Sequence, residues 1–311
     1  MRLAVGKWLA DGLMFFLLIG LIVLFSILSP YFLRIENLYA IGLTMSGIGI
    51  VCIGQSMVLL TGKFDVSVGS VVGFAGMTTA ILTREFGAYP LMVIAGVAIG
   101  ALVGLINGML VTKGRVNALI TTFSMLTIFQ GLTFIISSGY AVGVNQPGFR
   151  FLGTTRIGSF PLPIIILLVL YVLFYLILKH TVFGRYIYSI GGNREAARLS
   201  GINVDRIQIF AFMITGAMAA FSGVMLASRL GSAQVSAGSQ YPLNSIAACV
   251  LGGVSLNGGQ GNILGALVGV AIIAVIQSGL IMINVPSYFQ WIVTGIILIV
   301  AVFVDERRKT A

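Results

Sequence analysis

Long apolar runs, separated by short polar stretches, follow one another along almost the whole chain. A helix needs about 20 apolar residues to cross the hydrocarbon core of a bilayer. Runs of this kind fall at 11–29, 39–60, 66–83, 89–111, 116–137, 161–179, 207–228, 242–259, 262–283 and 286–304. The pattern predicts an all-α fold, a polytopic transmembrane bundle of about ten helices. Two glycine-rich stretches, 61–66 and 252–262, allow for a broken or re-entrant helix.

The charges between the runs predict an orientation. An even number of spans places both chain ends on one side of the membrane. If that side is the cytoplasm, five of the 18 Lys and Arg residues fall outside, namely Arg34, Arg84, Arg150, Arg156 and Arg229. The other thirteen fall inside: Arg2, Lys7, Lys63, Lys113, Arg115, Lys179, Arg185, Arg194, Arg198, Arg206, Arg307, Arg308 and Lys309. Because cytoplasmic loops are enriched in Lys and Arg, we expect cytoplasmic N- and C-termini.

The composition supports a membrane protein and excludes several kinds of chemistry. Only 8% of the residues are charged, which is far too few for the surface of a soluble domain of 311 residues. The net charge of +10 is explained by cytoplasmic loops rather than by a nucleic-acid surface. Cys52 and Cys249 lie in apolar runs, and His180 is the single histidine. These residues form no metal or catalytic cluster, so we expect no catalytic residues, no metal and no cofactor.

A short internal repeat suggests two related halves. Val66-Ser67-Val68-Gly69 resembles Val235-Ser236-Ala237-Gly238, and each follows a basic residue after a glycine-containing span. With five spans in each half, the second half is inverted relative to the first, as in many transporters. Chance is the alternative explanation for a match of four residues.

The segment 180–206 is the longest stretch expected in the cytoplasm. Gly191-Gly192 interrupts the chain, Asn193 is a favourable N-cap and Gly201 suits the position that follows a helix. The pattern predicts a two-turn helix over 193–201, too short to span a membrane. Such a helix suits docking into a cleft on a soluble partner, and the alternative is an interfacial helix that closes a loop.

Polar residues inside the spans are candidates for a translocation pathway. Asp65 lies in a glycine-rich break, where it is either an ion-coupling site or a local group that caps a helix or pairs with Lys63. Uncharged amides and hydroxyls within the spans, Gln277 among them, suit the passage of a neutral polyol, but they also make hydrogen bonds between helices. The candidate pathway residues are Gln55, Asp65, Ser67, Asn107, Asn244 and Asn257. The chain has no G-x-x-x-x-G-K-[ST] motif, so any ATPase is a separate polypeptide.

Several motifs together resemble one family. Gly184-Arg185-Tyr186, Ile190-Gly191-Gly192-Asn193 and Ala196-Ala197-Arg198-Leu199-Ser200-Gly201 resemble the coupling segment of ribose-type (monosaccharide) ABC transporter permeases. The stretches 61–70, 113–118 and 246–261 and the closing Val304-Asp305-Glu306-Arg307 are similar to that family too, in the same order. Lys63 and Phe64 depart from it, since family members often have Gly and Ile there. That departure bears on packing or gating beside Asp65.

The resemblance implies a non-catalytic permease subunit of a binding-protein-dependent importer, a single transmembrane domain over 1–311 with a coupling segment at 180–206. It implies a bacterial inner-membrane location and three partners: a cytoplasmic ABC ATPase, a periplasmic or lipid-anchored sugar-binding protein, and a second permease subunit, identical or not. The residues that it places against the ATPase are Gly184, Arg185, Gly191, Gly192, Asn193, Ala196, Ala197 and Gly201. Two alternatives are an ion-coupled secondary transporter that uses Asp65, and an ABC permease for another small hydroxylated ligand.

Overall fold

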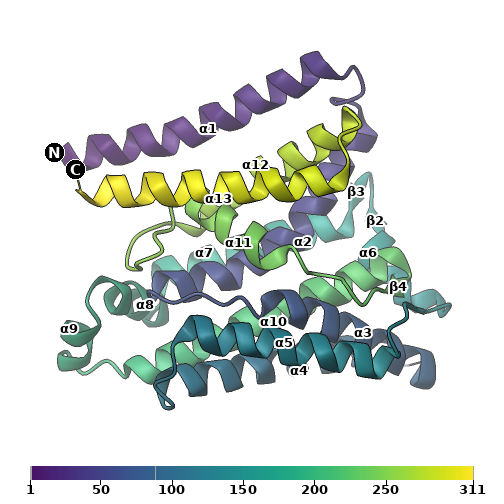
Figure 1. Cartoon of the computed structure of the whole chain (residues 1–311), viewed down its shortest axis with the longest axis horizontal. Helices are drawn as coiled ribbons and strands as arrows, with labels where there is room; N and C mark the ends of the chain where they lie inside the picture. The colour runs from purple at the N-terminus through teal and green to yellow at the C-terminus, as the bar shows by residue number, and fades with distance from the viewer. Residues whose placement is uncertain (1, 88, 311) are drawn as a thin grey trace.

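In a computed structural model, the chain forms a bundle of helices (Figure 1). The structure describes residues 2–87 and 89–310, without the side chains of residues 2–13, 147, 287 and 304–310. The helices are α1 (Arg2–Leu28), α2 (Ile35–Leu60), α3 (Val68–Phe86), α4 (Tyr89–Thr112), α5 (Ala118–Ser137), α6 (Phe151–Thr154), α7 (Leu162–His180), α8 (Val182–Gly192), α9 (Arg194–Leu199), α10 (Val204–Leu230), α11 (Tyr241–Leu251), α12 (Ile263–Met282) and α13 (Ser287–Thr310). A 3₁₀ turn covers Pro147–Arg150. Two short antiparallel pairs join β1 (Val142–Gly143) to β4 (Ser232–Ala233) and β2 (Arg156–Ile157) to β3 (Phe160–Pro161).

The helices confirm a polytopic helical membrane protein. Within the described residues, six helices are long and apolar enough to cross a membrane: α2, α4, α5, α7, α10 and α12. Each predicted run overlaps one helix, but the run at 242–259 is longer than the helix that forms there. Helix α11 ends at Leu251, and the chain that follows contains Gly253, Gly258 and Gly259 with φ between 70° and 88°. Because that left-handed backbone favours glycine, residues 252–262 form a loop instead.

Helix α2 forms the centre of the bundle, and every residue from Ser46 to Leu60 is buried. Helix α10 packs against α2, α3 and α4. Helix α4 presents a glycine at every fourth position to α10, at Gly96, Gly100, Gly104 and Gly108. A Cβ at Gly100 or Gly104 would collide with the backbone of α10, so the stripe allows the two helices to approach backbone to backbone.

The packing of the helices repeats between the two halves of the chain. Helix α3 packs on α4 and α5, while α11 packs on α12 and α13. Helix α2 packs on α12, and α10 packs on α4. The two repeat segments also meet, because a Cβ at Gly69 would lie 2.7 Å from the carbonyl oxygen of Gly238. Helices α1 and α7 depart from the correspondence, since α1 packs on α12 whereas α7 packs on α2.

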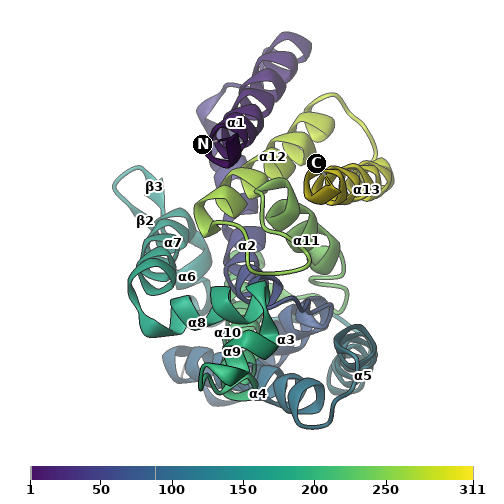
Figure 2. The ribbon, with the colours of Figure 1, turned by 90° about the vertical axis from the view of Figure 1, so that its left-hand side faces the viewer.

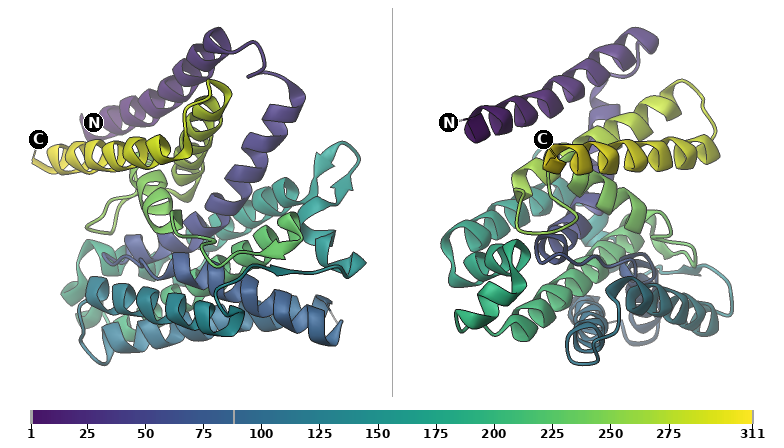
Figure 3. Two further views of the ribbon diagram at one scale, coloured as in Figure 1. Left: turned by 45° about the vertical axis from the view of Figure 1, so that its right-hand side comes forward. Right: turned by 60° about the vertical axis from the view of Figure 1, so that its left-hand side comes forward.

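The two ends of the bundle differ in structure. The start of α1, the end of α13 and helices α8 and α9 lie at one end, which faces the viewer in Figure 2. Helix α6 and the short strands lie at the opposite end, and Figure 3 gives the same arrangement from two sides. Residues 1 and 311 lie outside the described residues, as do the side chains of Arg2, Lys7, Arg307, Arg308 and Lys309 that enter the charge count.

Large apolar side chains are exposed along the outer helices. Ile27 of α1, Ile135 of α5 and Ile299 of α13 are each more than 70% exposed. Such surfaces are unfavourable in water and suit contact with lipid or with another membrane subunit.

Candidate translocation site

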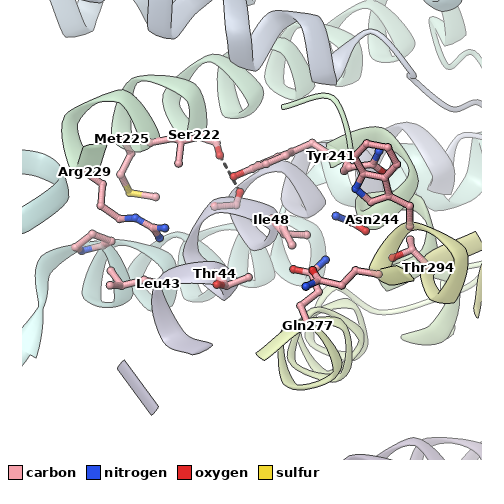
Figure 4. A pocket seen from close by; sticks show the side chains of 16 residues that line it. Leu43, Thr44, Ile48, Ser222, Met225, Arg229, Tyr241, Asn244, Gln277 and Thr294 are labelled. Atoms are coloured by element: carbon pink, nitrogen blue, oxygen red, sulfur yellow. Dashed lines mark hydrogen bonds between the residues drawn. The ribbon is translucent and has the colours of Figure 1, made fainter. Parts of the chain in front are cut away.

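A cavity of about 260 Å³ lies between α2, α10, α11, α12 and α13, with Pro163 at the start of α7 (Figure 4). Its volume is slightly below the ~300–1,000 Å³ of typical small-molecule pockets, which suits a small solute. The polar and aromatic residues that line it are Thr44, Ser222, Arg229, Gln240, Tyr241, Asn244, Gln277, Gln290, Trp291 and Thr294.

Contacts beneath the cavity fix the helices that form it. The Ser222 hydroxyl on α10 donates a hydrogen bond to the carbonyl oxygen of Gly47 on α2, at 2.8 Å. A Cβ at Gly47 would lie 2.5 Å from the Tyr241 hydroxyl oxygen, so only glycine leaves room for this tyrosine at the start of α11. Tyr241 and the side chains around it therefore depend on the close approach of α2, α10 and α11.

The lining is polar and nearly uncharged. Arg229 is the one charged residue among the described residues that line the cavity, and no described carboxylate joins it. The Oδ1 atom of Asn244 is buried and accepts no hydrogen bond from the described residues, so it is free to accept one from a solute. Trp291 and Tyr241 add aromatic faces. Amides that donate and accept, beside flat aromatic surfaces, suit a neutral polyhydroxylated solute better than an ion.

The structure separates the predicted pathway residues into three groups. Asn244 lines the cavity together with Gln277, another amide noted in the spans. Gln55, Asp65, Ser67 and Asn107 form a separate buried cluster. Asn257 is exposed in the loop between α11 and α12.

The Asp65 cluster ties the segment before α3 to its neighbours. Asp65 Oδ1 accepts hydrogen bonds from the backbone N–H and the hydroxyl of Ser67, at 2.8 and 2.6 Å. Asn107 of α4 donates to the Ser67 hydroxyl oxygen at 2.8 Å and to Asp65 Oδ2 at 3.4 Å. With its amide turned to match its partners, Gln55 of α2 donates to the Asp65 carbonyl at 3.1 Å. The described residues hold no ion pair between Asp65 and Lys63.

Most of the lining was not among the candidates from sequence. Arg229 appeared there as one of five outside charges, and Gln240, Tyr241, Gln290 and Trp291 were not singled out. The sequence contains one usable signal, a polar residue within an otherwise apolar helix, and it identified Asn244 and Gln277.

The segment 180–206 contains the short helix at the predicted position. The Asn193 side chain accepts the Ala196 N–H at 2.9 Å, which caps the start of α9. At its other end, Gly201 has φ +83°, and its backbone N–H donates to the Arg198 carbonyl oxygen. The Ile202 N–H donates to the Ala197 carbonyl oxygen. These two bonds make a Schellman motif, as the glycine predicts. The interruption comes at Asn193 rather than at Gly191-Gly192, since both glycines belong to the last turn of α8.

The remaining residues of this segment face different surroundings. Gly184 allows the tight turn between α7 and α8, where a Cβ would collide with the backbone at Leu178. Arg185 and Ala196 are exposed. Ala197 is buried in a cluster with Ile190 and Val204, so it does not contribute to the outer surface of α9. Leu199, at 75% exposure, is the large apolar group on that surface.

Three chain segments cross in backbone contact at Gly191. A Cβ on Gly191 would collide with the carbonyl oxygen of Leu60, at the end of α2, and with the amide nitrogen of Gly259. The Gly259 N–H donates to the Leu60 carbonyl oxygen at 2.9 Å. The end of α8 therefore touches both glycine-rich breaks of the chain, 61–66 and 252–262.

Comparison with known proteins identifies relatives of the whole chain. Residues 37–302 match the family described as branched-chain amino acid transport system / permease component. The ribose import permease protein of Escherichia coli strain K12 is 39% identical over 307 residues, covering 97% of this chain and 95% of that protein. The L-arabinose transport system permease protein of the same strain is 39% identical over 299 residues, with 94% and 91% covered. The ribose import permease protein of Bacillus subtilis strain 168 is 38% identical over 292 residues, with 93% and 90% covered.

Proposed function

Since this chain belongs to the family of transport-system permease components, we propose that it is the membrane-spanning subunit of a binding-protein-dependent ABC importer for a pentose. It lies in the bacterial inner membrane and carries out no chemical step. ATP is hydrolysed by a separate cytoplasmic subunit, and a periplasmic or lipid-anchored protein delivers the sugar.

The observation that carries this proposal is the match to sugar permeases over nearly the whole chain. The relatives named for ribose and for L-arabinose are equally similar to it, so the substrate class is a pentose rather than one sugar. The cavity supports this class, because its amides and aromatic faces suit a neutral polyol. The family description names branched-chain amino acids, whose ammonium group would need a carboxylate, and none lines the cavity among the described residues.

The topology that fits this function has about ten spans, cytoplasmic termini and two inverted halves of five helices. The matched packing of α2 and α12 with α10 and α4 supports the inverted halves, as does the contact between Gly69 and Gly238. The common location of the chain ends and α9 supports cytoplasmic termini. The whole of 1–311 then acts as one transmembrane domain that pairs with a second permease subunit.

Helix α9, within the segment 180–206, is the element that we assign to ATPase coupling. Its caps at both ends make it a rigid unit, and its exposed Leu199 offers an apolar anchor for a cleft on the ATPase. We expect Leu199→Glu to release the ATPase from the purified complex. Val116→Glu, which places the same charge in the loop between α4 and α5, is the matched control. If the ATPase stays bound to the Leu199→Glu permease, the assignment is wrong.

The pathway runs through the cavity. Of the six candidate pathway residues from the sequence, Asn244 is the one that lines it. We assign the cluster of Gln55, Asp65, Ser67 and Asn107 to holding α2, the start of α3 and α4 in register at the cytoplasmic end of this pathway. Asn257 lies in the loop that packs against Gly62 at this end. A Cβ at Gly62 would lie 3.1 Å from the Asn257 carbonyl oxygen.

The experiment reconstitutes the permease with its ATPase and binding protein in liposomes and measures ATP-dependent uptake of labelled ribose and arabinose. Trp291→Ala removes an aromatic face from the cavity, whereas Phe289→Ala removes an exposed ring from the same helix without touching the cavity. We expect uptake to fall roughly fivefold in the first variant only, since aromatic contacts contribute about 1 kcal/mol beyond buried area. Uptake that needs no ATPase would overturn the proposed class of transporter.

A further inference from the structure

A second hollow, of about 620 Å³, lies where α7 ends, beside α8 and the start of α12. It is at the same end of the bundle as α9, whereas the cavity that we assign to transport contains Pro163, at the opposite end of α7 (Figure 1). Lys179 and Arg185 supply two positive charges to it, and Tyr175 and Tyr188 supply aromatic rings. No carboxylate lines it among the described residues.

Its two cations are not neutralised by the protein. Neither Lys179 nor Arg185 takes part in an ion pair within the described part of the chain. The carboxylates described nearby in sequence are already engaged, since Glu195 pairs with Arg198 and Asp205 with Arg194. The Lys179 ammonium donates to the Tyr175 hydroxyl at 2.7 Å, which leaves two of its three N–H groups free.

The start of α12 adds to the positive field. Helix α12 is 20 residues long, and its N-cap Asn262 and first residue Ile263 border the hollow. The N-terminal end of a helix carries a partial positive charge that favours anions. The Tyr188 hydroxyl donates to the Gly261 carbonyl at 3.0 Å, so that oxygen does not oppose an incoming anion.

An apolar surface leads from the hollow along α7. Leu168, Val169, Val172, Leu173 and Leu176 are all exposed on this helix. Tyr175 lies between this strip and the two cations, which is where amphipathic rings sit at a membrane interface. A molecule with an anionic head and apolar chains matches this order of groups.

We propose that this hollow binds the phosphate headgroup of an anionic phospholipid of the cytoplasmic leaflet. The inference rests on the cytoplasmic placement of this end under the proposed function. Lys179 and Arg185 hold the phosphate, with the guanidinium able to contact two oxygens at once. The acyl chains lie along the exposed strip of α7. Basic hollows at the cytoplasmic ends of membrane helices suit this type of ligand.

Native mass spectrometry of the full-length permease tests the proposal. The protein is purified in detergent and offered equal amounts of phosphatidylglycerol and phosphatidylcholine. A Lys179→Gln/Arg185→Gln variant removes both cations, while Lys113→Gln/Arg206→Gln removes the same charge from exposed positions elsewhere at this end. Because each basic residue in contact with an anionic headgroup contributes about 1 kcal/mol, or roughly fivefold, and only Lys179 and Arg185 line the hollow, we expect the retained ratio to fall about 25-fold in the first variant. The control keeps the wild-type ratio.

Three outcomes overturn the proposal. Equal retention by wild type and the first variant means that the two cations bind no lipid. Displacement of the lipid by inorganic phosphate alone means that the site takes a free anion. If the permease is purified together with its ATPase, loss of the ATPase with the lipid retained in the first variant means that the hollow is a protein interface. The lipid readout needs neither sugar nor ATP, so a failure of the transport assay leaves it intact, and the reverse also holds.

Discussion

Replacing Gly191 by alanine tests whether the backbone crossing at the end of α8 is essential. The added methyl group collides with the Leu60 carbonyl and the Gly259 amide, both of them backbone groups that cannot rotate away. To reach an ordinary carbon contact distance, the segments must separate by roughly 1 Å or more. Gly192→Ala is the matched control, because a Cβ at Gly192 meets nothing within 4 Å.

The expected cost follows from opposing contributions. Overpacking costs about 1–3 kcal/mol, and weakening the Gly259–Leu60 hydrogen bond adds about 1 kcal/mol. Alanine in place of glycine within a helix stabilises the folded protein by about 0.5–1 kcal/mol. This contribution applies to both variants, because both glycines lie in α8. We therefore expect Gly191→Ala to be destabilised by about 1–3 kcal/mol and Gly192→Ala to be unchanged or slightly stabilised.

Two measurements on purified protein check this prediction. Thermal unfolding in detergent should give a lower midpoint for Gly191→Ala than for Gly192→Ala. In the reconstituted importer, Gly191→Ala should also show less uptake per ATP hydrolysed, because the contact between α8 and the end of α2 is displaced. If the two variants unfold alike and transport alike, the crossing has no role in stability or coupling.

Three further predictions use the same reconstituted importer and the same unfolding assay. Asp65→Asn should keep ATP-dependent uptake, because the amide oxygen can still accept both hydrogen bonds from Ser67, and only the 3.4 Å contact with Asn107 is lost; complete loss of uptake at unchanged stability would favour an ion-coupling role. Gly104→Ala should destabilise the protein by about 1–3 kcal/mol through the α4–α10 contact, whereas Gly131→Ala on α5 meets nothing within 4 Å and should not. Asn193→Ala removes the N-cap of α9, so it should lower the stability of the protein by about 1 kcal/mol and reduce ATPase association. Asn193→Ser should restore both, since Ser is an equally good cap.

The sequence predicts local structure here better than it predicts which helices face each other. The caps of α9 depend on residues within a few positions of one another, so Asn193 and Gly201 mark its ends correctly. Spans follow from apolar length alone. The glycine-rich stretch 252–262 indicated a break, but the run at 242–259 extends past the end of α11 because Val254 and Leu256 are apolar, and the left-handed conformation of Gly253, Gly258 and Gly259 is seen only in the backbone angles.

The cavity could not be predicted in the same way. Its lining comes from six helices, and apolar residues surround α2, α10 and α12 on all sides, so periodicity does not distinguish their faces. Arg229 and Gln240 belong to the end of α10 and to the loop before α11, where they read as ordinary interfacial residues. The glycine stripe of α4 is visible in the sequence, but its partner helix is not.

The crossing at Gly191 connects the proposed coupling helix to the cavity through continuous elements. Helix α2 ends at this crossing with Leu60 and lines the cavity at Thr44 and Ile48, farther along the same helix. The loop that contains Gly259 follows α11, whose first residues include Tyr241 and Asn244 in the cavity wall. We therefore expect a displacement of α8 and α9 by the proposed ATPase subunit to reach the ends of two elements that form the cavity. Because backbone meets backbone there, no side chain can absorb the displacement, and the end of α2 and the loop that follows α11 are the segments that would move with it.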